Sequence, residues 1–212
     1  MRELSFAVDS VTTEPFAAAP HLLLQLRITA PRGTRVDAIL LRAQVQFDAP
    51  ARSYSAGERA SLKDLFGEGA VWGRALRPML WTHAQTTVAP FEGATNVPLP
   101  VPCVFDYNAA ATRYFHALES GDVPINLLFS GTVFARDEDG ALRATQLPTT
   151  AETRYALPLT TWQSLRERHA PQSAALVIPR DLFDRINRFR IDAGAPTLEH
   201  ALERLLARTE PA

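Results

Sequence analysis

The chain has 212 residues, of which 46% are hydrophobic and 21% charged, a composition typical of a globular protein and not of a disordered one. Its net charge of −1 provides no global field that would attract nucleic acid or an anionic membrane. The single cysteine, Cys103, excludes an internal disulfide and a metal site built from several cysteines of one chain.

Alternating side chains predict three strands in the first fifty residues. Apolar residues occupy every second position over residues 4–9, 22–29 and 39–47. The turn at residues 31–34 contains Pro31 and Gly33. We therefore expect the second and third strands to form an antiparallel pair.

A helix is predicted after the third strand. Ser55 and Glu58 have the spacing of a capping box, and Gly67 follows the apolar positions as a helix stop. Two further strands are predicted over residues 80–88 and 94–105. The second of these has proline at every other position, which predicts an edge strand that resists pairing on its proline side. These prolines are Pro98, Pro100 and Pro102.

The longest apolar run, residues 123–134, holds no ionisable side chain. We interpret it as a central strand buried on both faces, with a bend or bulge at Gly131. A helix over residues 107–118, capped by Asp106, precedes it. Strands over 141–146 and 153–157 follow, and then a helix capped by Thr160 or Thr161 that runs to His169.

The last forty residues predict a strand (174–178) and two helices. Pro179 is expected at the first position of the first helix, Gly194 ends that helix, and Thr197 begins the next. This tail loosely resembles a ribbon–helix–helix DNA-binding unit. Its strand, however, offers no side chain that could read a base edge, which favours an appendage that packs against protein.

Together these elements predict a β-rich α+β fold. We expect an antiparallel sandwich of about seven or eight short strands with inserted helices over residues 1–170, and a strand–helix–helix appendage over residues 171–212. No signal-peptide pattern and no apolar run near the ~20 residues of a membrane helix is present. We therefore expect a cytoplasmic protein without membrane contact.

Indole, guanidinium and imidazole groups are concentrated between residues 72 and 83. Aromatic and arginine side chains often anchor protein interfaces, so this stretch is the candidate partner-binding surface. An arginine stacked on an indole inside the domain is the structural alternative. The candidate residues are Trp72, Arg74, Arg77, Trp81 and His83.

Catalytic and metal-binding patterns are absent from the sequence. It has no nucleophile elbow, P-loop, dinucleotide fingerprint or HExxH motif. His83, Cys103 and His116 could form a metal set by residue type, but their spacing does not support one, and a free cysteine is most often a small buried hydrophobe. We predict no catalytic residue, no metal and no cofactor.

Short segments spread over nearly the whole chain carry one further indication. They are Arg52–Ser55, Leu65–Gly67, Trp72–Gly73, Leu76–Pro78, Leu80–His83, Leu99–Cys103, Leu128–Phe134 and Tyr155–Pro158. Together they resemble a family of uncharacterised bacterial proteins with a domain of unknown function, often encoded beside nickel–iron hydrogenase structural and maturation genes. The resemblance implies an accessory or assembly role and no catalytic residue.

The resulting hypothesis is a non-enzymatic accessory protein that acts through protein–protein contacts, in hydrogenase assembly or function. Its partner would be a hydrogenase subunit or maturation factor. Association of the chain with copies of itself is a further alternative. Two alternatives are a ribbon–helix–helix-like regulator, which predicts salt-dependent DNA binding, and a small-molecule or metal-binding sandwich that uses His83 and His116.

Overall fold

The computed structural model describes residues 4–14, 16–69, 72–103, 109–137, 139–171 and 178–208. The chain divides into two compact units, residues 1–174 and 175–212, and each is considered separately below.

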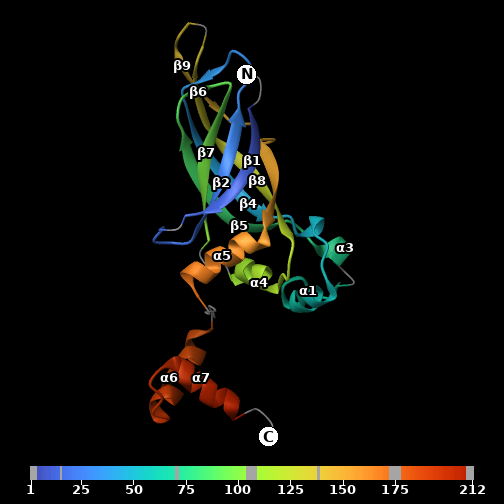
Figure 1. Cartoon of the computed structure of the whole chain (residues 1–212), viewed down its shortest axis with the longest axis vertical. Coiled ribbons are helices and arrows are strands. Elements are labelled where there is room, and N and C mark those ends of the chain that lie inside the picture. The colour runs from blue at the N-terminus through green and yellow to red at the C-terminus, as the bar shows by residue number, and fades with distance from the viewer. Residues whose placement is uncertain are drawn as a thin grey trace. The chain divides into compact units, whose positions relative to one another are not determined.

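The first unit combines antiparallel strands with short helices (Figure 1), which confirms the predicted β-rich α+β class. Its strands are β1 (Ser5–Thr13), β2 (His21–Thr29), β3 (Arg35–Val36), β4 (Ala38–Phe47), β5 (Met79–Val88), β6 (Phe91–Glu92), β7 (Ala94–Pro102), β8 (Asp122–Arg136), β9 (Leu142–Gln146) and β10 (Glu152–Pro158). Its helices are the 3-10 helix η1 (Ala49–Ala51), α1 (Ala56–Ser61), α2 (Lys63–Phe66), α3 (Trp72–Ala75), α4 (Ala109–Ala117) and α5 (Leu159–His169). The described residues thus contain ten strands, more than the seven or eight expected.

Two antiparallel sheets supply the hydrophobic core. One has the strand order β1-β2-β7, and the other has the order β10-β8-β4-β5, with β9 also paired to β8. Inward side chains of both sheets belong to one buried cluster. Phe6 of β1 stacks on Phe129 of β8 with ring centroids 4.4 Å apart, so the two inner faces meet as in a sandwich.

The expected pairing of the second and third strands is wrong. The turn forms, since the N–H of Thr34 donates to the carbonyl of Pro31. The chain then pairs briefly as β3 with β6 and enters the other sheet as β4. β2 instead pairs with β1 and β7. A turn signal indicates a reversal of the chain, but it does not specify that both arms stay in one sheet.

β8 is a central strand, as predicted, but it is buried on one face only. Every second residue from Val123 to Phe129 is buried, while the residues between them are half-buried. Its register with β4 passes through Gly131 without a shift, so the pair has no bulge there. Gly131 has a φ of +150°, and a Cβ at this position would overlap the carbonyl oxygen of Leu40. The glycine therefore permits close approach of two strands.

The helices of the first unit gather at one end of the strands (Figure 1). Ser55 caps α1 in a full capping box with Glu58, and Gly67 ends α2 with a φ of +78°, both as predicted. α5 begins at Leu159 after Pro158, so the predicted threonine cap is wrong. The predicted cap Asp106 lies outside the described residues.

The second unit contains α6 (Arg180–Asp192) and α7 (Leu198–Ala207), which confirms the two predicted helices. Thr197 caps α7 by accepting a hydrogen bond from the N–H of His200. Pro179 is the N-cap of α6, one position before the predicted one. Most of the predicted strand over residues 174–178 lies outside the described residues.

Candidate functional site

Two of the five predicted contact residues, Trp72 and Trp81, are core side chains that are each only 6% exposed. The indole N–H of Trp72 donates to the carbonyl of Gly67 at 2.9 Å, and its ring meets Tyr54 and Phe66 edge to face. These contacts fix the indole inside the helical end of the first unit.

The ring of Trp81 lies on the inner face of β5. It stacks on Phe47 with centroids 5.1 Å apart, and it meets Phe115 of α4 edge to face at 5.2 Å. Phe115 in turn stacks on Trp162 of α5 at 4.4 Å. The tryptophan is therefore a core side chain that joins the sheet to α4 and, through Phe115, to α5.

The other three predicted contact residues are placed differently. Arg77 and His83 are exposed, and His83 lies on the outer face of β5. The side chain of Arg74 lies outside what the structure describes. A contact surface in this region would therefore consist of Arg77 and His83 without the indoles.

His83, Cys103 and His116 are not brought together. Cys103 is buried, and its thiol donates to the carbonyl of Val101 at 3.4 Å. His116 packs edge-on against Trp162, and burial together with the Arg166 guanidinium lowers the pKa of its imidazole. Within the described ranges, no group of three or more His, Cys, Asp or Glu residues could hold a metal ion.

The environment of Cys103 predicts an unreactive thiol. Burial raises its pKa to about 12, so roughly one molecule in ten thousand would carry the nucleophilic thiolate at pH 8. We expect Ellman's reagent to label native protein very slowly and unfolded protein rapidly. A Phe16→Cys variant is the control, because Phe16 is 97% exposed and its replacement should react at once. Rapid labelling of the native wild type would contradict this environment.

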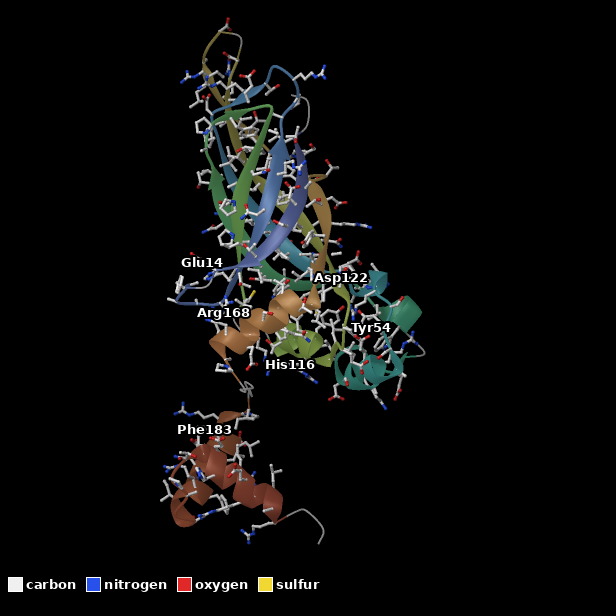
Figure 2. The ribbon with its side chains drawn as sticks, in the orientation of Figure 1. Glu14, Tyr54, His116, Asp122, Arg168 and Phe183 are labelled. Atoms are coloured by element: carbon white, nitrogen blue, oxygen red, sulfur yellow. The ribbon has the colours of Figure 1, made fainter. Side chains whose placement is uncertain are left out.

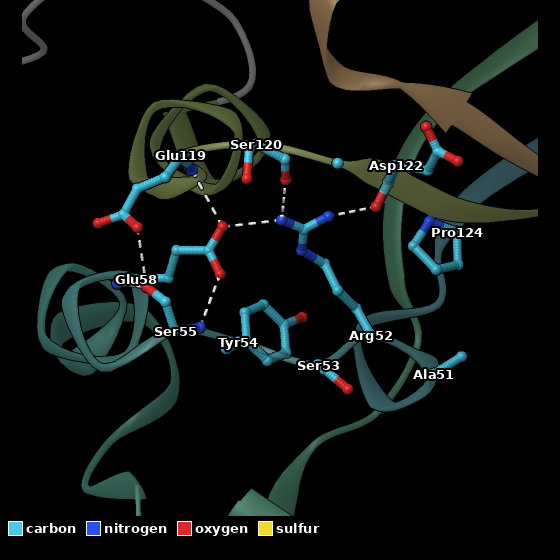
Figure 3. A pocket seen from close by; sticks show the side chains of 11 residues that line it. Ala51, Arg52, Ser53, Tyr54, Ser55, Glu58, Glu119, Ser120, Asp122 and Pro124 are labelled. Carbon is cyan, nitrogen blue, oxygen red and sulfur yellow. Dashed lines mark hydrogen bonds and ion pairs between the residues drawn. The ribbon is translucent and has the colours of Figure 1, made fainter.

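A polar cavity of about 560 Å³ lies where α1 meets the start of β8 (Figure 3). At its centre is Arg52, whose side chain is 7% exposed. The guanidinium donates to the carbonyls of Ser120, at 2.6 Å, and Asp122, and to Oε1 of Glu58 at 2.7 Å. One arginine thus connects the segment before α1 to residues almost seventy positions later.

Glu58, only 5% exposed, completes this network. Its carboxylate accepts hydrogen bonds from the backbone N–H groups of Ser55 at 2.9 Å and Glu119 at 3.0 Å. Burial alone would raise the pKa of this carboxyl, but the two N–H donors and the Arg52 guanidinium outweigh burial and lower it. Glu58 is therefore an ionised group that the fold stabilises.

Two tyrosines, Tyr54 and Tyr114, lie beside the network. Figure 2 labels Tyr54 at this helical end, together with Asp122 and His116. The hydroxyl of Tyr54 donates to the carbonyl of Ala49 at 2.9 Å, so the 2.8 Å bond between the two phenols must be donated by Tyr114. Burial raises the pKa of both phenols. Neither phenol is set up to act as a base.

The chemistry of this cavity is that of a structural network. The positive charge of Arg52 is balanced by Glu58, and its terminal nitrogens are engaged by protein acceptors. Its Nε is buried without a hydrogen-bond partner among the described residues, and the guanidinium carbon lies 5.8 Å from the centroid of the Tyr54 ring. The sequence indicated the Ser55–Glu58 capping box, but it gave no signal for the ion pair of Glu58 with Arg52.

The second unit exposes a different kind of surface. Its two helices carry large apolar side chains in solvent, including Phe183, labelled in Figure 2 and 43% exposed. In the described part of this unit, only Ala195 and Ala201 are buried. Large exposed apolar side chains grouped on one small unit indicate an interaction surface. The other exposed members are Leu182, Ile191, Leu202 and Leu206.

These features define a two-unit α+β protein: an antiparallel sandwich-like unit stabilised by a buried ion-pair network, and a helical unit with exposed apolar side chains. The chain belongs to a family of unknown function (DUF6084), whose model matches residues 1–212. No curated protein and no solved structure matches it. Among the described helices, none combines the length and apolar character needed to span a membrane.

Proposed function

We propose that the protein is a non-enzymatic accessory protein that acts through protein–protein contacts. The observation that supports this most is the exposed apolar surface of α6 and α7. This unit has little hydrophobic core of its own, since only Ala195 and Ala201 are buried among its described residues, and a unit with so little core usually needs disulfides, metals or a partner for stability. It has no cysteine, so a protein partner is the stabiliser that its side chains favour.

The mode of contact follows from the helix surfaces. Leu182 and Phe183 on α6 and Leu202 on α7 are among the exposed apolar side chains that a partner would contact. Amphipathic helices bind by laying such residues into an apolar groove, so the partner should offer a groove rather than a charged surface. Arg77 and His83 on the first unit form a second, polar contact region in this proposal.

The class of partner rests on the family resemblance. A family often encoded beside nickel–iron hydrogenase genes favours a hydrogenase subunit or maturation factor as the partner. In this proposal the protein assists the assembly or function of that enzyme in the cytoplasm. A reproducible turnover of any substrate that is lost on changing Cys103 or His83 would refute the non-enzymatic part.

The test is affinity purification of the tagged full-length protein from its host, grown under hydrogenase-inducing conditions, with mass spectrometry of the bound proteins. With the wild type we expect to recover hydrogenase subunits or maturation factors. With a Phe183→Asp/Leu202→Asp variant we expect the recovered amount of these proteins to fall at least about tenfold, because the contact would bury a charge in apolar surroundings. Phe16→Asp is the matched control, because Phe16 is exposed in the first unit. It should retain the partner.

Three outcomes separate the parts of the proposal. Retention of the partner by the helix variant, with loss on changing Arg77 and His83 to alanine, would move the contact to the first unit. Recovery of a protein unrelated to hydrogenases would remove the hydrogenase assignment. A protein that purifies alone would refute a stable complex.

A further inference from the structure

A groove runs along the outside of the first unit, between strands of the two sheets. β5 is an edge of one sheet and β7 an edge of the other, and the two strands lie beside one another. In the described part of the chain no backbone ladder joins them. The gap is therefore a place where two sheets adjoin without forming hydrogen bonds.

The prolines of β7 explain why this gap stays open. Backbone N–H groups of successive residues in a strand point to opposite sides. The N–H of Cys103 donates to the carbonyl of Pro20, on the side of β2. The alternate positions therefore face β5, and these hold Pro98, Pro100 and Pro102, which have no N–H to donate.

The groove encloses about 620 Å³, a volume in the range of small-molecule sites. Pro100 and Pro102 give it an apolar wall on one side. On the other side Arg42 and Gln85 are cross-strand partners on β4 and β5, so both point outward together, and His83 lies two residues along β5. His21 of β2 lies opposite Pro102 and completes the lining.

The charge of this groove is not balanced. Arg42 has neither an ion pair nor a hydrogen-bond partner within the described residues, unlike Arg27, Arg52 and Arg143, which pair with carboxylates. None of the described lining residues is acidic. A guanidinium without a carboxylate partner, beside amide and imidazole groups, matches the recognition chemistry of a carboxylate or phosphate.

The two histidines supply further polar atoms. Nδ1 of His21 lies 2.8 Å from the carbonyl of Ala19, which can only accept, so Nδ1 carries the proton and Nε2 is the remaining polar atom of that ring. The ring of His83 has no hydrogen-bond partner in the described part of the structure. The His83 ring can therefore donate an N–H to an anion, whereas Nε2 of His21, with the proton on Nδ1, accepts a hydrogen bond from a hydroxyl or N–H of a ligand.

We propose that this groove binds a small organic oxyanion, a molecule that presents a carboxylate or phosphate to Arg42 and an apolar body to Pro100 and Pro102. Arg42 provides the charge and a planar pair of donors. Gln85, His21 and His83 provide the orienting polar contacts. This site is independent of the apolar helices, so it can be tested whether or not a protein partner is found.

The test uses the full-length protein at constant ionic strength, with amide chemical shifts of β5 and β7 followed by NMR during titration. The probes are phenyl phosphate, benzoate, inorganic phosphate and acetate. We expect saturable shifts with the aromatic probes and weaker binding of the two small anions, because only the aromatic probes can cover the proline wall. The aromatic probe that binds with the higher affinity shows whether the groove prefers a phosphate or a carboxylate.

Arg42→Gln should weaken binding of the tighter probe about tenfold or more, the usual size of a lost charge-assisted hydrogen-bond pair. Arg154→Gln is the matched control. Arg154 is exposed on β10, so this substitution removes the same charge at a position outside the groove. Absence of saturable shifts with all four probes would overturn the proposal, as would equal weakening by both variants. Equal binding of aromatic and small anions would overturn the organic character of the ligand.

Discussion

Replacing Glu58 by alanine is expected to lower the free energy of unfolding by about 3–5 kcal/mol. The substitution leaves the Arg52 guanidinium buried without its counter-charge, and it leaves the N–H groups of Ser55 and Glu119 without their acceptor. Urea denaturation followed by circular dichroism measures this loss through the transition midpoint, provided that the slope stays unchanged.

An exposed ion pair is the control for this variant. Asp64 pairs with Arg113 at 3.4 Å, and both side chains are mostly exposed. Asp64→Ala should therefore change stability by less than about 1 kcal/mol. A similar loss for both variants would mean that the Arg52–Glu58 network contributes no more than a surface pair.

The same carboxylate predicts a pH dependence. The pKa of Glu58 is lowered from its ordinary value of 4.5, so its ionised form contributes stability above that value. This contribution is lost as pH falls below 4.5 and through the folded-state pKa. The difference in stability between wild type and Glu58→Gln should be largest at pH 7 and should shrink at pH 3. A difference that stays constant over this interval would contradict the lowered pKa.

Replacing Gly131 by alanine is expected to cost about 3 kcal/mol or more, because two penalties combine. The φ of +150° is strained for any residue with a side chain, and the added Cβ would overlap the carbonyl oxygen of Leu40 in β4. The strands β4 and β8 would have to separate at the centre of their sheet. Thermal and urea unfolding both report this loss.

Gly33→Ala separates the two penalties. Gly33 also has a positive φ, +72°, but a Cβ there would meet nothing within 4 Å. Its replacement should cost only the strain of the left-handed conformation, about 1–2 kcal/mol. If both variants lose the same stability, close approach to Leu40 is not what requires glycine at position 131.

The sequence predicts local features of this fold well and long-range ones poorly. The inward residues of β2 and β4 follow from alternation, and the Ser55 capping box follows from spacing over four positions. Both signals depend only on neighbouring residues. Which strand pairs with which depends on contacts between distant segments, so the expected β2–β4 pairing is wrong even though both strands are correct.

The candidate sites show the same division. Residue type suggested that Trp72 and Trp81 meet a partner, but both indoles fill the core, which residue type alone cannot distinguish from an interface. The alternating prolines of β7 correctly predict an edge strand. The groove beside that edge combines His21, Arg42 and His83 from three strands, and no sequence interval relates these residues.

The pairing of β4 with β8 has a consequence for how the protein folds. Ala38 pairs with Phe134 and Phe47 with Ile125, so the centre of the larger sheet closes a very long loop. Long-range pairing of this kind slows folding, because chain entropy is lost before the contacts form. During synthesis one hydrogen-bonding edge of β4 therefore stays unpaired until β8 has been made, and an unpaired strand edge is a template for pairing with another chain.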